Sequence, residues 1–310
     1  MAITAAMVKE LREITGVGML DCKKALAETD GDMEKAVEYL REKGLAASAK
    51  KAGRIAAEGV AYVAIAPDNK TGVIVEVNSE TDFVAKNPVF QEYVAQVAEH
   101  IMDSEAADVD ALLAEPWKFD KSVSVADALS QKVAVIGENL KIRRFEKYIK
   151  KAAGALVSYI HGGGRIGVLV ELECEKEDPA LIELGKNLAM QVAALNPKFV
   201  HVEDVPTEFI AHEKEILTKQ AQEDPKNANK PANILEKMID GRLNKELKEF
   251  CLVEQPYVKD SDMTVKKYID TVAKEVGAPI KIKRIVRFET GEGLAKKEEN
   301  FADEVAKAMQ

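Results

Sequence analysis

The pattern of apolar and polar residues predicts a small helical bundle at the start of the chain. Apolar residues recur at helical spacing between Thr4 and Gly16, over 19–29 and over 33–43, which predicts three helices. Four residues of the second helix are expected to face inward: Leu20, Cys22, Ala25 and Leu26. Because the connections are short, the three helices are expected to pack together. The small, basic stretch 46–54 is interpreted as a linker; a local nucleic-acid contact is less favoured because the stretch has no aromatic residue.

The body of the chain contains an internal repeat of β-rich hairpins. The run GVAYVAI at Gly59 falls on GALVSYI at Gly154, and GVIVEV at Gly72 falls on GVLVEL at Gly167, both at a shift of 95 residues without a gap. In each copy the two β-rich runs flank a short stretch of turn residues, which predicts a hairpin. The helices predicted after the hairpins lie at about 88–102 and 178–195.

The ends of the two copies also match, at a larger shift of 140. Residues 125–137 and 140–144 fall on 265–277 and 280–284, which predicts one further helix and a third strand in each copy. Repetition on this scale indicates two related α/β units, each built around a small antiparallel sheet. The larger shift means that the second copy carries an insertion, expected at about 200–255.

The insertion is predicted to be an antiparallel pair of amphipathic helices at 207–223 and 231–250. In the second of these, apolar residues recur at steps of four and three and form one stripe: Leu235, Ile239, Leu243, Leu247 and Phe250. Two such helices joined by a short loop form an αα-hairpin, expected to project from the second unit as a coiled-coil arm. A last helix is predicted within 291–310, with Phe301 and Val305 on one face.

These elements predict an α+β protein of several domains. We expect a three-helix domain with its linker at 1–54, a first core unit at 55–148, a second core unit that contains the helical hairpin at 149–290, and a C-terminal helical module at 291–310. A chain of 310 residues is long enough to bury more than one core.

Charge and cysteine content argue against several classes of function. The chain has 44 Lys and Arg against 53 Asp and Glu, a net charge of −9, which argues against a protein that coats nucleic acid or an anionic membrane. Its three cysteines lie far apart without a CxxC pair, which indicates reduced thiols. The N-terminal stretch is charged where a signal peptide needs an apolar region, and no apolar run reaches ~20 residues. We therefore expect a cytoplasmic protein with no membrane segment.

The sequence shows no pattern typical of an enzyme. The HGGG run at His161 is similar to the oxyanion loop of lipases, but the chain has no GxSxG nucleophile elbow, and the repeat places this run at a hairpin turn. No GxxxxGK[ST] phosphate loop is present, and the four histidines lack metal-ligand spacing. We therefore expect no catalytic residue, no metal and no cofactor, and a protein that acts by binding.

One loop departs from the repeat. After the first hairpin, residues 78–88 place Asp82 and Phe83 between a strand and a helix, whereas the corresponding 173–179 of the second copy is shorter and polar. A Phe in such a loop is commonly buried in the core. The alternative is an exposed wedge that inserts an aromatic ring into a partner.

Four runs of residues make the chain similar to a known family. They are MLDCKKAL at 19–26, TDFVAKN at 81–87, HGGGRIGV at 161–168, and RFE at 287–289 with GEG at 291–293. In this order they closely resemble the bacterial elongation factor Ts family. The resemblance implies an N-terminal three-helix bundle like a ubiquitin-associated domain, two related core subdomains, a coiled-coil hairpin inserted in the second, and a C-terminal helical module.

The resemblance also implies a function and the residues that perform it. Members of the family bind elongation factor Tu in its GDP state and promote the exchange of GDP for GTP. By resemblance, the segment that pushes toward the Mg²⁺ of this GTPase consists of Thr81, Asp82, Phe83 and Val84. The residues implied to hold the partner are Arg12, Met19, Leu20, His161, Phe301 and Val305. The alternative is an interaction scaffold without exchange activity, and one-to-one and two-to-two complexes both stay open.

Overall fold

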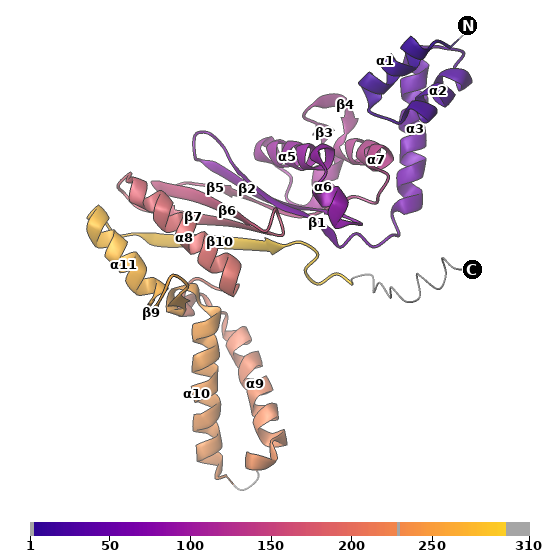
Figure 1. The fold of residues 1–310 in the computed structure, drawn as a ribbon. Helices are drawn as coiled ribbons and strands as arrows, with labels where there is room; N and C mark the ends of the chain where they lie inside the picture. Colours follow the sequence, from indigo (N-terminus) through magenta and orange to yellow (C-terminus); the bar gives the residue numbers. More distant parts are fainter. Residues whose placement is uncertain (1–2, 228–229, 296–310) are drawn as a thin grey trace.

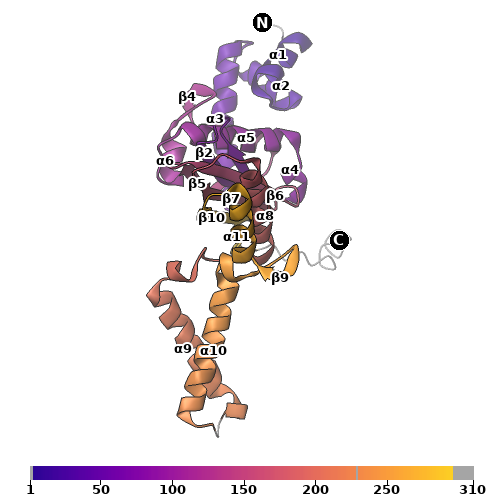
Figure 2. The same ribbon diagram turned by 90° about the vertical axis from the view of Figure 1, so that its left-hand side faces the viewer.

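The structure is a computed structural model that describes residues 3–227 and 230–295. A helical module at the N-terminal end, a central pair of sheets with helices outside them, and a long helical hairpin that projects from the second sheet follow one another along the chain (Figure 1). The same view turned by 90° shows the hairpin extending well away from the sheets (Figure 2). The predicted mixture of helices and small antiparallel sheets is therefore confirmed.

The N-terminal module consists of α1 (Ala5–Thr15), α2 (Met19–Glu28) and α3 (Met33–Lys51). The Thr4 side chain caps α1 by accepting from the Met7 N–H, and Asp32 caps α3 in the same way. The small core between the helices contains Val8, Leu11, Cys22, Ala25, Leu26, Ala36 and Leu40. The likeness of this module to a ubiquitin-associated domain stays a prediction.

Two expectations about this module are wrong. Leu20 does not face inward: its side chain is 84% exposed at the start of α2. The third helix, predicted over 33–43, does not end before Gly44 but continues to Lys51, through most of the predicted linker. Gly44 instead lies buried against α7 (Val125–Ile136), where an added Cβ would be 3.4 Å from the Cβ of Ala134. The glycine therefore allows two helices to approach closely and does not end one.

Two three-stranded antiparallel sheets form the centre of the molecule. The first has the order β1 (Glu58–Ile65), β2 (Thr71–Ser79), β5 (Lys141–Ile149), and the second has the order β10 (Lys281–Glu289), β7 (Ile166–Glu173), β6 (Gly154–His161). Gly72 pairs with Ile65 and Tyr148 in the first sheet. In the second, Gly167 pairs with the residues at the two predicted shifts, Ile160 and Phe288. The strand registers therefore confirm the internal repeat.

The helices of each unit cover the outer face of its sheet. They are α5 (Pro88–Asp103), α6 (Val109–Ala114) and α7 in the first unit, and α8 (Pro179–Leu195) and α11 (Val265–Val276) in the second. The repeat also extends further than predicted, to a two-stranded hairpin before the last helix of each unit. These hairpins are β3 (Pro116–Trp117) with β4 (Asp120–Ser124), and β8 (Pro256–Tyr257) with β9 (Asp260–Thr264).

The inner faces of the two sheets pack against each other. A separate apolar cluster fills the space between them: Ala61, Val63, Ile74, Tyr148, Leu156, Leu169, Val286 and Phe288. At Gly167 an added Cβ would be 3.0 Å from the carbonyl oxygen of Ala61 and from Cγ2 of Val63. The two units are therefore held together as one core body by close packing.

The projecting arm consists of α9 (Thr207–Glu223) and α10 (Ala232–Phe250). The predicted stripe is buried between the helices at three positions, Ile239, Leu243 and Leu247. At the base of the arm the carbonyl of Phe250 accepts from the N–H groups of Lys198 and Phe199. Short 3₁₀ helices lie near the arm at η1 (Val202–Asp204), η2 (Pro225–Asn227) and η3 (Leu252–Glu254). The predicted helical hairpin is confirmed, and its coiled-coil geometry stays a prediction.

Candidate partner-binding surface

The loop that departs from the repeat forms a single helical turn, α4 (Asp82–Ala85). Thr81 caps it: its Oγ1 accepts from the Val84 N–H at 3.3 Å. Val84 is half-buried against the core of the first unit and Ala85 is buried, so they anchor the inner side of the turn. The turn is therefore held by the fold on one side and presents its other side to solvent.

Phe83 lies on the solvent side of this turn, and its side chain is 81% exposed. This exposure excludes the interpretation of Phe83 as a core residue, and its insertion into a partner stays a prediction. Beside it, a carboxylate oxygen of Asp82 lies 2.6 Å from Nζ of Lys86. The hydrogen bond from Lys86 lowers the pKa of Asp82, so the carboxylate is ionised at neutral pH. The turn thus presents an aromatic ring next to a negative charge.

A carboxylate from the end of α7 holds the start of this turn. Glu138 Oε2 accepts from the backbone N–H groups of Glu80 and Thr81, both at 3.0 Å, and Glu138 Oε1 accepts from the Thr81 hydroxyl at 2.7 Å. In return, the Glu80 carboxylate accepts from the Asn139 N–H at 2.6 Å. We call these four residues, Glu80, Thr81, Glu138 and Asn139, the clasp.

The turn between β6 and β7 lies next to α4. Gly162, Gly163 and Gly164 have φ values of +59°, +67° and +103°, a backbone that side chains with a Cβ rarely adopt. Asp82 and Lys86 line an open pocket of about 220 Å³ together with this turn. Two segments predicted separately from the sequence therefore share one surface. The third glycine also has a structural role, because an added Cβ at Gly164 would be 2.7 Å from a methyl group of Val60.

His161 is exposed at the start of this turn, and its Nδ1 lies 3.0 Å from the hydroxyl of Tyr159. The three glycines after His161 connect β6 to β7, which confirms the prediction that the HGGG run is a hairpin turn.

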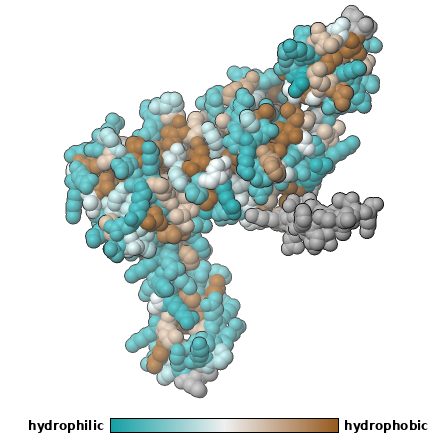
Figure 3. Space-filling model, in the orientation of Figure 1, coloured by the Kyte–Doolittle hydropathy of each residue, from teal (hydrophilic) through white to brown (hydrophobic). Residues whose placement is uncertain are grey.

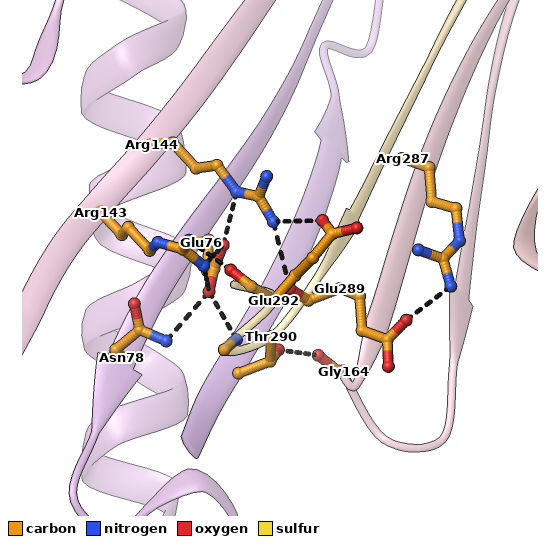
Figure 4. A network of polar contacts seen from close by, with 10 residues as sticks. Glu76, Asn78, Arg143, Arg144, Gly164, Arg287, Glu289, Thr290 and Glu292 are labelled. Atoms are coloured by element: carbon orange, nitrogen blue, oxygen red, sulfur yellow. Dashed lines mark hydrogen bonds and ion pairs between the residues drawn. The ribbon is translucent and has the colours of Figure 1, made fainter. Parts of the chain in front are cut away.

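The end of β10 is tied to the first sheet beside the same pocket (Figure 4). The buried carboxylate of Glu76 accepts from Arg143 at 2.9 Å, from Arg144 at 2.6 Å, and from the backbone N–H of Gly291 at 2.8 Å. Burial alone would raise the pKa of Glu76, but the hydrogen bonds from Gly291, Asn78 and the two arginines hold it below its ordinary value. The Glu76 carboxylate is thus ionised, and its hydrogen bonds fix the position at which the chain leaves the second sheet.

The other predicted partner-binding residues lie elsewhere. Arg12, Met19 and Leu20 are exposed on the N-terminal module, where Figure 3 shows apolar residues on the surface. Figure 1 shows α1 and α2, which carry these residues, well separated from the two sheets. Phe301 and Val305 lie outside the described residues. The structure therefore brings α4 and the turn that follows His161 to one pocket and keeps the N-terminal residues on a second surface.

Within residues 3–227 and 230–295, no group of three or more His, Cys, Asp or Glu residues is placed to hold a metal ion. His100 is buried, with Nε2 bonded to Glu115 at 2.9 Å and Nδ1 accepting from the Lys118 N–H, which indicates a structural role. No helix of this described part is both long and apolar enough to span a lipid bilayer.

The likeness to known proteins agrees with these features and covers nearly all of the chain. The family model described as Elongation factor TS matches residues 80–292. The chain belongs to the elongation factor Ts family. It is 55% identical over 308 residues to Elongation factor Ts of Clostridioides difficile (strain 630), 55% identical over 307 residues to that of Clostridium novyi (strain NT), and 52% identical over 312 residues to that of Trichlorobacter lovleyi; each alignment covers 99% of both chains. As an elongation factor Ts family member, the protein is a translation elongation factor.

The elongation factor Ts motif around Phe83 was found from the sequence, but the residues that hold it were not. Glu138 and Asn139 follow directly after the predicted helix 125–137 and lie between the two runs that match at the shift of 140. A signal was present: at the shift of 140, Glu138 corresponds to Ala278, a charged residue against an apolar one. The contact between Glu76 and Gly291 joins residues 215 positions apart, and no local pattern marks it.

Proposed function

We propose that the protein is a guanine nucleotide exchange factor for elongation factor Tu. The observation that carries this proposal is the exposure of Phe83 on a turn held by the clasp. A large aromatic side chain that is 81% exposed contributes little to the stability of the fold. Its exposure to solvent therefore favours a role in binding. The ionised carboxylate of Asp82 beside it supports a role near a bound cation.

An exchange factor must weaken the hold of a GTPase on its nucleotide. A nucleotide bound at ~1 nM is held by about 12 kcal/mol, largely through phosphates and Mg²⁺. Coupling between two ligands is reciprocal, so the factor must bind the nucleotide-free GTPase much more tightly than the loaded one. In the proposed mechanism the segment from Thr81 to Val84 enters the partner near its Mg²⁺ site. There the Phe83 ring displaces partner groups and the Asp82 carboxylate disturbs the surroundings of the Mg²⁺.

Other surfaces of the chain are proposed to hold the partner while the wedge acts. Arg12, Met19 and Leu20 on the N-terminal module would contact the GTPase domain, together with Phe301 and Val305, and His161 would contact a different domain of the partner. Binding energy from these remote contacts can offset the strain of opening the nucleotide site. In this mechanism the protein needs no chemical active site, metal or cofactor of its own, and works in the cytoplasm without nucleic-acid or membrane contacts.

The test is a Phe83→Ala variant assayed for release of a fluorescent GDP from elongation factor Tu. We expect release at saturating factor to slow about thirtyfold, the effect of losing an aromatic anchor worth about 2 kcal/mol. The melting temperature should stay nearly unchanged, because an exposed side chain contributes little to stability. Phe119→Ala is the control, since Phe119 is a partly exposed phenylalanine of the same unit outside α4.

An interaction scaffold is the alternative function. In that case Phe83→Ala would leave GDP release as slow as it is without the factor, and the wild type would not accelerate release either. If Phe83→Ala accelerates GDP release as well as the wild type does, the protein is an exchange factor but Phe83 is not its wedge.

A further inference from the structure

We infer that Glu138 is a positioning residue that holds the α4 wedge in its active orientation, within a clasp that also contacts the chain leaving the N-terminal module. The functional part of this inference rests on the proposed exchange activity. Its structural part, the restraint of the loop by the clasp, can be measured on the protein alone.

The Glu138 carboxylate is the main partner of the loop that leads into α4. Glu138 follows Gly137, whose φ of +89° ends α7 and turns the chain toward the loop. The two carboxylate oxygens take three donors from only two residues, Glu80 and Thr81, at 2.7 to 3.0 Å. Hydrogen bonds to an ionised acceptor are about twice as strong as neutral ones. A helix of one turn is too short to be stable without such support.

The same clasp reaches the chain that leaves the N-terminal module. Asn139 is buried, and its side chain donates to the carbonyl of Arg54 at 2.8 Å. The Glu80 carboxylate also lies 3.4 Å from the Arg54 guanidinium. In addition, α3 packs on α7 through Gly44. The position of the wedge is thereby fixed relative to the module that carries Met19 and Leu20.

The second unit shows that the fold itself does not need this carboxylate. There Gly277 ends α11 as Gly137 ends α7, but Ala278 follows it. The loop instead supplies Lys176, whose Nζ donates to the carbonyl of Val276 at 3.1 Å. In both units the loop donates, but in the second unit the donor is a lysine side chain of the loop and the acceptor is a backbone carbonyl at the helix end. The acidic clasp is therefore found in the unit whose loop carries Asp82 and Phe83.

Loss of the Glu138 carboxylate should free the loop without unfolding the unit. The N–H groups of Glu80 and Thr81 would lose their acceptor, and the Thr81 hydroxyl would no longer be oriented to cap α4. Phe83 would then occupy its bound orientation for only part of the time. Because the contacts of the N-terminal module are unchanged, maximal exchange should fall more than the apparent affinity for the partner.

The experiment compares wild type, Glu138→Ala and Glu138→Gln, each alone and combined with Phe83→Ala. In the free protein, amide hydrogen exchange of Glu80 and Thr81 should accelerate about tenfold in Glu138→Ala, while amides of the β2–β5 pair stay protected. The maximal rate of GDP release should fall about fivefold. Glu138→Gln keeps one acceptor oxygen and should lie between the two in both measurements. In the Phe83→Ala background, removal of Glu138 should slow release no further, because the wedge is already absent.

Lys176→Ala is the matched control, since it removes the corresponding contact of the second unit, and it should change neither measurement. Unchanged amide exchange of residues 80 and 81 in Glu138→Ala would overturn the inference. The inference would also be overturned if removal of Glu138 slowed GDP release by the same factor in Phe83→Ala as in wild type, because Glu138 would then act independently of Phe83. If Phe83→Ala alone leaves release unchanged, the wedge role of the proposed function fails, and the functional role of Glu138 fails with it. The amide exchange result still decides whether the clasp restrains the loop.

Discussion

Both core units bury a glutamate on the middle strand of the sheet and pair it with an arginine on the third strand. In the first unit Glu76 accepts from Arg144 at 2.6 Å, and in the second Glu171 accepts from Arg284 at 2.6 Å. Each arginine also crosses to the other unit: Arg144 lies 4.3 Å from the ring of Phe288, and Arg284 lies 3.7 Å from the ring of Tyr148. The repeat therefore includes the contact between the units as well as the fold of each one.

The units differ in what they attach to this shared frame. Glu76 of the first unit takes three further partners, Arg143, the Asn78 amide and the N–H of Gly291, and the loop of this unit carries the clasp and α4. The second unit has Lys283 in place of Arg143, paired with Glu173, and carries the arm. Apart from the exchange of Arg143 for Lys283 within a strand, these departures from the repeat lie at loops and chain ends, where a change does not disturb the packed sheets. The predictions below test this division.

The largest effect is expected from the glutamate with more partners. Glu76→Ala should lower the free energy of unfolding by about 3–5 kcal/mol, because it removes a buried carboxylate that pairs with two half-buried guanidinium groups and accepts from the Gly291 N–H. Glu171→Ala should cost less, about 1–2 kcal/mol, since Glu171 pairs with one arginine, Arg284, which is more exposed. Denaturant unfolding of both variants measures the difference. Equal losses would show that the extra contacts of Glu76 do not stabilise the fold.

Methyl groups added at two glycines between the closely packed sheets should destabilise the protein by different amounts. Gly167→Ala should cost about 2–3 kcal/mol, because its Cβ would lie 3.0 Å from a backbone carbonyl oxygen that cannot move freely. Gly72→Ala should cost about 1 kcal/mol, because its nearest neighbours, at 3.1 Å, are the flexible tips of Leu169. Thermal unfolding compares the two. A larger loss of stability for Gly72→Ala would mean that the Leu169 side chain yields less easily than the backbone near Gly167.

The contribution of Glu76 should also depend on pH. Its pKa is lower in the folded protein than the ordinary value of 4.5, so unfolding takes up a proton in acid. The stability gained from its ionised form is complete above that ordinary value and is lost as the pH falls through the folded pKa. Unfolding of wild type and Glu76→Gln over this range should therefore show curves that converge in acid. A constant difference at all pH values would contradict the assigned charge.

The smallest effect is expected from shortening the arm. Replacing 212–245 by a short Gly-Ser linker keeps Phe209 and Phe250 at the base, where their rings lie 5.7 Å apart. The stability of the two sheets should change by less than about 1 kcal/mol, since the arm has its own internal packing. Loss of cooperative unfolding in this variant would show that the arm belongs to the core of the second unit. Phe250 must be kept because its carbonyl holds Lys198 and Phe199.

The sequence alone determined the elements and their repetition. Helices such as α9 and α10 follow from apolar spacing, because one face of an isolated helical hairpin must be buried whatever lies around it. The matched runs at Gly72 and Gly167 established two related units, since equal patterns of strands and turns form equal hairpins. The motif around Phe83 was also visible, because its residues are consecutive in the chain.

Tertiary structure alone decided which side chains are buried and what holds the motif. Leu20 fits an inward position on its helix by spacing and is exposed, while Phe83 fits a buried plug and is not. Burial depends on which other elements pack against a residue, and local spacing does not contain that information. The clasp joins Thr81 to Glu138 across 57 residues, and Glu76 meets Gly291 across 215. Such hydrogen bonds exist only after the chain has folded, because the packing of α7 and β10 brings donors and acceptors together.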